Sequence, residues 1–389
     1  MYKNEVKLNS KDLETIVGGY GANASTSASV KKVPSNILRF KQSAVGEVDL
    51  FAVGLESTYY VVDRATKTLS QYQNVDGEPI LIKTGVNLSS YTRLIRLVEV
   101  EDGLLLFTND ETEGEACIWK TPNIDTLPTL VYKSSTGDNA GFFSIRNQFG
   151  IDVHSNGLTS IVLAGVYGRG NTEQDLLLST DSGSTFNVVK KTTTTTTDTD
   201  NSHWHDVAID TYHGLLWASQ GDGVDKRNVY WSSDMGETWN ILNADDKDHI
   251  QPTAVLPFSD RIIFGRDSGV AGLDVAHKPT DARELTSMKM DDLAVIKNVP
   301  AHWYYGISAL TDGQEGYMYF LIVDQEPRMV MGTGDGGKSW HSVFMGYGSE
   351  HDGGTISGLA GIDDNYMYAY RQKTGGALEL LYSERIKWV

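Results

Sequence analysis

The richest chemistry in this 389-residue chain lies in one short segment, 203–206, with the sequence His-Trp-His-Asp. It opens a run of apolar residues typical of a strand. Residues two apart in a strand lie on the same side, so we expect His203 and His205 to face the same way. Two imidazoles so placed suit a divalent metal ion, with Asp222 or His249 as further ligands. The open alternative is a buried hydrogen-bonded network that needs no metal and no cofactor.

Similar side chains precede other predicted strands. The candidate catalytic residues, which could transfer protons, are His205, Asp206, Tyr304 and Asp222. The candidate ligand-binding residues are Arg93, Arg169, His203, Trp204, His249, Arg266, His302, Trp303, His351 and Asp352. Aromatic rings can stack on a sugar ring while Arg, His and Asp bind its hydroxyls. Convergence of such groups on one concave surface is typical of a binding or catalytic site.

The elements that must position these residues show a repeat. Segments 179–186, 232–239 and 333–340 share the pattern Ser/Thr-x-Asp-x-Gly-x-Ser/Thr-aromatic, each between two strand-like runs. The pattern predicts a hairpin turn in which Asp and hydroxyl groups bind backbone N–H groups and Gly takes a positive φ. We therefore expect a structural role for Asp181, Gly183, Asp234, Gly236, Trp239, Asp335, Gly337 and Trp340.

These segments resemble the Asp box, or BNR repeat, of sialidases and related β-propellers. The resemblance implies an all-β fold of four-stranded antiparallel blades. Including degenerate copies, the hairpins recur about every 50 residues, near residues 63, 123, 181, 234, 274, 335 and 384. We expect seven blades, or six if the terminal units merge. The last hairpin lacks an outer strand, which segment 35–41 is expected to supply, closing the ring and removing exposed sheet edges.

In a four-stranded blade, the connections between strands lie on two opposite faces of the propeller. The connections between third and fourth strands carry the Asp motif. The second-to-third and blade-to-blade connections share the opposite face, and the candidate site residues stand there. We therefore expect the ligand site on that face, over the central channel.

The resemblance implies a glycan ligand, and whether the glycan is cleaved is left open. In a lyase, Arg93 or Arg169 would hold a carboxylate while His205 or Tyr304 takes the α-proton. In a glycoside hydrolase, the paired carboxyl groups would come from Asp206, Asp222 or Asp352.

Non-catalytic alternatives have equal standing. They are a lectin, an adhesin, a protein-binding propeller or an assembly factor, because a fold does not define a function. A true sialidase is disfavoured, since the Arg-Ile-Pro motif of that family is absent and Arg39 is followed by Phe40.

The first 19 residues form a separate segment. Leu8, Leu13 and Ile16 precede Gly18-Gly19, a spacing that resembles the double-glycine leader of bacteriocins. In that family an ABC exporter with a peptidase domain cuts after the second glycine, which implies a bacterial secreted protein. The alternative is a short helix ended by glycine. We expect a leader at 1–19, a linker at 20–35 and a single propeller domain at 36–389.

The amino-acid composition disfavours several classes of binding partner. The chain has 51 acidic and 33 basic residues and a net charge of −18, which disfavours binding to nucleic-acid phosphates or anionic lipid. No apolar run is long enough to span a bilayer. The single cysteine, Cys117, excludes an internal disulfide framework and a multi-thiolate zinc site. We expect an extracellular monomer that does not insert into membranes.

Overall fold

The computed structural model describes residues 40–54, 58–76, 78–109, 115–134, 143, 150–168, 173–192, 203–221, 228–242, 252–266, 273–279, 289–292, 304–305, 318–322, 328–333, 341–346, 355–362, 366–373 and 377–385. These residues contain strands and no α-helix. Accordingly, the described chain has no helix of the length and apolarity needed to cross a membrane.

Five of the sheets are four-stranded and antiparallel, and in each of them neighbouring strands follow one another in the chain. The first of these sheets contains β5 (Leu94–Val100), β6 (Gly103–Asn109), β7 (Ala116–Thr121) and β8 (Thr129–Lys133). The next contains β9 (Ile151–Ser155), β10 (Ser160–Gly165), β11 (Asp175–Ser179) and β12 (Asn187–Lys191). The third contains β13 (His203–Asp210), β14 (Leu215–Gly221), β15 (Val229–Ser232) and β16 (Asn240–Ile241).

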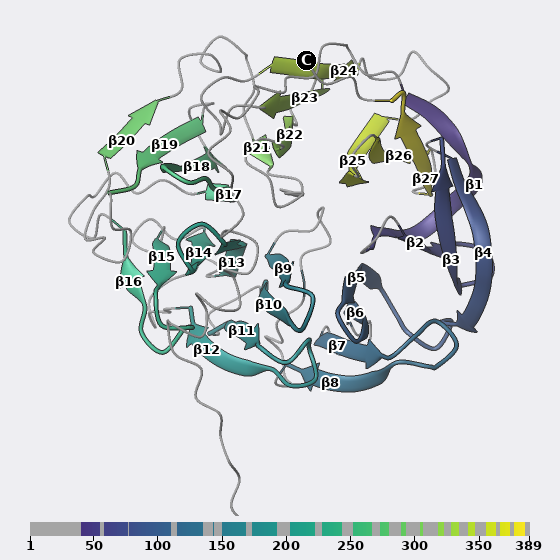
Figure 1. The fold of residues 1–389 in the computed structure, drawn as a ribbon, viewed down its shortest axis with the longest axis horizontal. Helices are drawn as coiled ribbons and strands as arrows, with labels where there is room; N and C mark the ends of the chain where they lie inside the picture. Colours follow the sequence, from purple (N-terminus) through teal and green to yellow (C-terminus); the bar gives the residue numbers. More distant parts are fainter. Residues whose placement is uncertain are drawn as a thin grey trace, which may run out of the picture.

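Two further four-stranded sheets follow. One contains β17 (Pro252–Pro257), β18 (Arg261–Arg266), β19 (Leu273–His277) and β20 (Lys289–Asp292). The other contains β21 (Tyr304–Tyr305), β22 (Met318–Ile322), β23 (Arg328–Thr333) and β24 (His341–Gly346). The sheets stand around a common centre, with strands such as β5, β9 and β13 nearest to it and β8, β12 and β16 at the rim (Figure 1). The predicted all-β propeller of antiparallel blades is confirmed.

The remaining sheet has seven strands in the order β25-β26-β27-β1-β2-β3-β4. Its members are β25 (Thr355–Ile362), β26 (Met367–Gln372), β27 (Leu378–Ser383), β1 (Phe40–Val53), β2 (Thr58–Asp63), β3 (Thr68–Val75) and β4 (Glu78–Asn87). Strand β1 is 14 residues long and serves two groups of strands. Counting it in both divides this sheet into two four-stranded groups, so the whole arrangement is consistent with seven blades.

Strand β1 joins the two ends of the chain. Its first part pairs with β27, Phe40 opposite Ser383, and its last part pairs with β2, Val53 opposite Tyr59. The register shifts between the two parts, and Gly46, with φ +81°, lies in that shift. An N-terminal strand therefore closes the ring, as predicted. The described pairing begins at Phe40, and residues 35–39 of the predicted segment lie outside the described residues.

The hydrophobic core is divided among the spaces between neighbouring sheets. One cluster joins β10 and β11 to β13 and β14 through residues such as Leu163, Leu178 and Ile209. Another joins the seven-stranded sheet's two halves through Phe51, Tyr59 and Tyr368. Middle strands are covered on both faces, so all six residues of β10 are buried. This explains why such strands read as continuous apolar runs.

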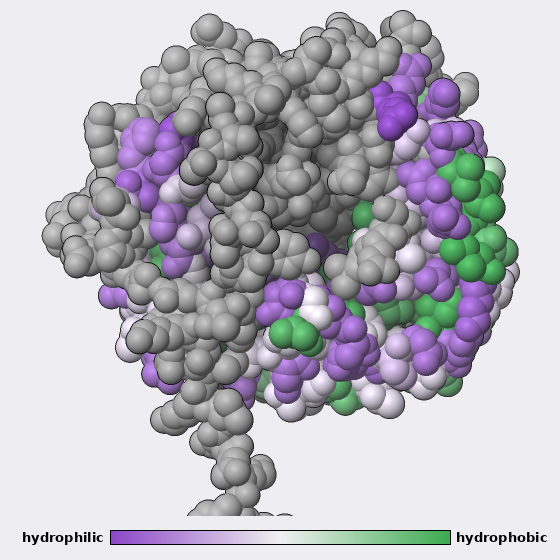
Figure 2. All heavy atoms as spheres, in the orientation of Figure 1, coloured by the Kyte–Doolittle hydropathy of each residue, from purple (hydrophilic) through white to green (hydrophobic). Residues whose placement is uncertain are grey.

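The rim is more exposed and partly apolar. Ile80, Leu81 and Ile82 of β4 are 49%, 52% and 54% exposed, and Leu127 and Leu130 near β8 are about equally so. Figure 2 shows this as green surface at the right-hand rim, where Figure 1 places β4.

Two of the predicted hairpins are displaced by one strand. The turn after Asp63 joins β2 to β3, the second and third strands of their group, because β1 already supplies the first. Likewise residue 274 lies within β19 and does not centre a turn. The predictions near residues 123, 181 and 234 fall between third and fourth strands, as expected.

Candidate functional site

The start of β13 carries a stack of three rings. Tyr167 lies over His203 with ring centroids 3.7 Å apart, and His203 lies over His205 at 4.7 Å. His203 is 1% exposed and His205 5%, whereas Tyr167 is half-buried. Tyr167 follows β10 and belongs to a second-to-third connection. The stack therefore lies on the predicted ligand face, with Tyr167 as its most accessible ring.

Neighbouring glycines make room for His205 of this stack and for the adjacent Trp204. A Cβ at Gly221 would lie 2.0 Å from the His205 imidazole, and a Cβ at Gly165 would lie 2.5 Å from Cβ of Trp204. Trp204 is 1% exposed, and its Nε1 donates to the backbone oxygen of Gln174 at 3.0 Å. His205 Nδ1 lies 3.1 Å from the backbone oxygen of Pro252. Close packing on all sides fixes the rings in place.

Asp206 points across to the neighbouring sheets. Its Oδ2 accepts the N–H of Val255 in β17 at 2.8 Å, and its Oδ1 accepts the N–H of Gly150 beside β9 at 3.4 Å. The register of β13 with β14 shifts by one residue between Trp204 and Asp206, which is a β-bulge at the start of β13. Both carboxylate oxygens of this predicted catalytic residue thus bind backbone of adjoining blades.

Three further side chains make contacts of the same kind. Arg96 in β5 donates to the backbone oxygen of Ile151 in β9. Asp152 in β9 accepts the N–H of Ile209 in β13 at 2.7 Å. The Tyr370 hydroxyl in β26 bonds both the N–H and the oxygen of Phe51 in β1, at 2.9 and 3.0 Å.

We refer to Arg96, Asp152, Asp206 and Tyr370 as the inter-blade ties. Among the described residues, β5, β9, β13 and β17 end their sheets, and the part of β1 that holds Phe51 pairs with β2 alone, so one side of each lacks a β-ladder partner. Each tie bonds that free backbone edge on the next blade. Asp152 and Tyr370 are not predictable as site residues from the sequence, because a side chain that bonds backbone can have any residue type as its partner.

The ties have shifted pKa values. Removal from water raises the pKa of Asp206 to about 7, with a further contribution from the Asp152 charge. Removal from water also raises the pKa of Asp152 to about 6, against the lowering effect of the Ile209 N–H and Arg96. The same desolvation lowers the pKa of Arg96 to about 10. One cation therefore stands near two acids that titrate close to neutral pH.

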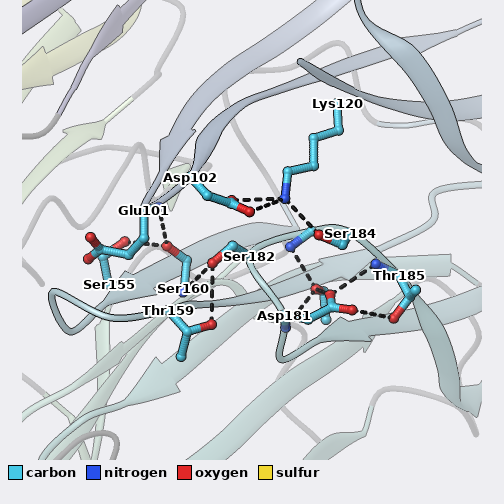
Figure 3. Close-up of polar contacts among 12 residues, drawn as sticks. Glu101, Asp102, Lys120, Ser155, Thr159, Ser160, Asp181, Ser182, Ser184 and Thr185 are labelled. Atoms are coloured by element: carbon cyan, nitrogen blue, oxygen red, sulfur yellow. Dashed lines mark hydrogen bonds and ion pairs between the residues drawn. The ribbon is translucent and has the colours of Figure 1, made fainter. Parts of the chain in front are cut away.

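The two described Asp-motif turns have the same hydrogen bonds, and Figure 3 shows the first. Asp181 Oδ1 accepts the N–H of Thr185 at 2.9 Å, and its Oδ2 accepts the Thr185 hydroxyl at 2.7 Å. Asp234 does the same with Thr238 at 2.9 and 2.5 Å. Ser179 and Ser232 each accept a glycine N–H at 2.8 Å.

The glycines of these turns meet the preceding blade. Gly183 has φ +78° and a Cβ there would lie 2.6 Å from Leu105 in β6. Gly236 has φ +82° and a Cβ there would lie 2.9 Å from Val189 in β12. Trp239 packs at the edge of the core between the two sheets. The contacts of these motif residues are with turn and core, on the face away from Tyr167.

The other predicted site residues are only partly placed. Arg93 is exposed, has φ +40°, and its backbone oxygen accepts the N–H of Asn109 at 3.1 Å, just before β5. Arg266 ends β18 opposite Pro252, and Tyr304 lies in β21 opposite Ile322. Outside the described residues lie Arg169, Asp222, His249, His302, Trp303, Asp335, Gly337, Trp340, His351 and Asp352.

The metal prediction is not tested. His203 and His205 are adjacent, as expected, but Asp222 and His249 lie outside the described residues. Within the described ranges, no group of three or more His, Cys, Asp or Glu side chains could hold a metal ion. Cys117 is buried.

No protein-family model matches this chain, and no curated protein matches it. Solved structures do resemble it. YCF48 from Cyanidioschyzon merolae has a TM-score of 0.51 at 9% identity, over 88% of this chain and 98% of that one. YCF48 bound to D1 peptide has a TM-score of 0.50 at 11% identity, over 91% and 99%. At such identities the likeness shows the propeller fold alone.

Proposed function

We propose that this propeller is a recognition module that binds a carbohydrate on the face carrying Tyr167, without cleaving it. The observation behind this choice is the ring stack of Tyr167, His203 and His205, which presents one half-buried tyrosine on a fixed base. A rigid aromatic ring suits the apolar face of a sugar, and little conformational entropy is lost when it binds.

Binding is favoured over cleavage by the contacts of the predicted catalytic residues. General acid–base catalysis needs a group within hydrogen-bond reach of the substrate. Both oxygens of Asp206 accept backbone N–H groups, and His205 Nδ1 contacts the Pro252 oxygen. The pKa of Asp206, about 7, would suit a general acid, but its contacts suit a tie between blades.

The test is a glycan array probed with the full chain, followed by calorimetric titration of any sugar that binds. Tyr167→Ala should weaken binding at least tenfold because the stacking surface is lost, while Tyr167→Phe should retain most of it. Leu158→Ala is the matched control, since Leu158 is 89% exposed on the turn between β9 and β10 and should not change affinity.

Two outcomes would overturn the proposal. Product formation from any bound glycan would contradict the non-catalytic part. Absence of binding across the array, with binding to a peptide library, would favour a protein-recognition propeller instead. Peptide binding is worth the second screen because a fold neighbour is described as bound to a peptide.

We also propose that residues 1–19 are a double-glycine leader removed by an ABC exporter. Cleavage after Gly19 would leave β1, which starts at Phe40, intact. Mass spectrometry of protein collected outside producing cells should give Tyr20 as the first residue. Exported protein that retains Met1 would contradict the leader.

A further inference from the structure

The inter-blade ties combine buried charge with main-chain bonds at the centre of the ring. Asp152 is the middle one. Its Oδ2 accepts the Ile209 N–H at 2.7 Å, and its Oδ1 accepts the N–H of Val153 at 2.9 Å. It therefore joins β9 to the edge of β13 that pairs with no strand in the described part of the chain.

We propose that Asp152 is a pH-responsive tie, through which the ring is held more tightly in mildly acidic solution than at alkaline pH. The ionised carboxylate places a negative charge between two blades, and the protonated carboxyl keeps an oxygen for the Ile209 N–H without that charge.

The charged groups around Asp152 explain why the ionised carboxylate is the less favourable form in the folded chain. Arg96 of β5 is the neighbouring cation, and Asp206 of β13 is a second acid that shares it. Tyr370 of β26 interacts with the same arginine, and His154 lies two residues along β9 with its own pKa lowered by burial. Opposite Asp152 in β10 is Leu163, which is apolar. With both acids ionised, one arginine faces two negative charges.

The direction of the pH dependence of stability follows from the coupling between proton binding and folding. The pKa of Asp152 is about 6 in the folded chain, above its usual value of 3.8, because burial disfavours the ionised form. Such a group stabilises the fold fully below about pH 4 and loses that contribution as the pH rises through 6.

The test compares melting temperatures of wild type and Asp152→Asn from pH 5 to pH 8. Asparagine keeps an oxygen for the Ile209 N–H and removes the charge. The melting temperature of the variant minus that of wild type should be about 3 °C higher at pH 8 than at pH 5. Asp125→Asn is the matched control, because that carboxylate is 50% exposed and pairs with the equally exposed Lys83, so its difference from wild type should stay constant.

Hydrogen exchange of the segment around Ile209 adds a local measurement. After correction for intrinsic rates, protection should fall above pH 7 in wild type and change little in Asp152→Asn. Asp152→Ala, which lacks any acceptor, should lose protection at every pH. Parallel melting curves for wild type and Asp152→Asn, or protection that is independent of pH in both, would overturn the proposal.

Discussion

At the scale of single residues, burial and hydrogen bonding shift the pKa values of two aspartates in opposite directions. Asp181 and Asp206 are both acids bound to backbone N–H groups. Burial tends to raise the pKa of Asp181, but hydrogen bonds from Thr185 and Ser179 outweigh it and the pKa is lowered. For Asp206 desolvation dominates and the pKa is raised. The first acid should therefore stabilise the fold at neutral pH, and the second should stabilise it in acid.

Replacing Asp181 by alanine tests the first case. It removes the acceptor for the Thr185 N–H and hydroxyl and should cost about 2 kcal/mol at pH 7. Because the pKa of Asp181 is lowered on folding, the loss should shrink as the pH falls below about 4. Urea unfolding at both pH values measures it. Asp125→Ala, in the equivalent turn of the preceding blade, should cost under about 0.5 kcal/mol; an equal loss there would refute this role.

At the scale of elements, β1 is unusual because it pairs with β27 in the last blade and with β2 in the first. The first part of β1 is held to the last blade by Glu379 of β27, which is 1% exposed. Its carboxylate accepts the Gln42 amide at 2.6 Å and Arg371 Nε at 2.8 Å. A polar cluster thus fastens the strand that closes the ring.

Glu379→Ala leaves Arg371 without its buried partner and frees Gln42. Loss of one member of a buried ion pair should lower the free energy of unfolding by about 3 kcal/mol. Glu47→Ala is the control, since that side chain is 45% exposed and should contribute under about 1 kcal/mol. Chemical denaturation of both variants measures the difference; equal stabilities would show that the cluster does not fasten β1.

How far the sequence predicts these elements depends on the distance over which each signal acts. The turns at Asp181 and Asp234 are local, so their residue patterns place them correctly. The double use of β1 is not local, so the sequence pattern around Asp63 predicts a hairpin of third and fourth strands where the structure has the second and third, β2 and β3. The inter-blade ties are the hardest of these features to predict from the sequence, because Asp152 accepts a backbone N–H of another blade. Their discovery needs the three-dimensional arrangement.

At the scale of the whole molecule, stability is shared between blades. Among the described residues, core clusters lie between neighbouring groups of strands, and the sheet of β9–β12 contributes to two of them. The sheet of β9–β12 therefore shares its core with the sheets on both sides of it. We expect the ring to unfold as one cooperative unit.

Leu163→Ala tests this cooperativity. Leu163 is fully buried between two sheets, so the cavity should cost about 2–5 kcal/mol. Tryptophan fluorescence, to which Trp204, Trp217 and Trp231 of one sheet contribute, should then shift together with far-ultraviolet circular dichroism. Two separate transitions would show that blades unfold independently.

The shared strand also sets the order in which the molecule can form. Gln42 and Glu379 are 337 residues apart in the chain, so their contact closes a very long loop. Such non-local pairing is slow, and β27 keeps an unpaired edge until it occurs. Refolding should therefore end with a slow, closure-limited phase. Until then the open edge is exposed to other copies, and yield should fall as protein concentration rises.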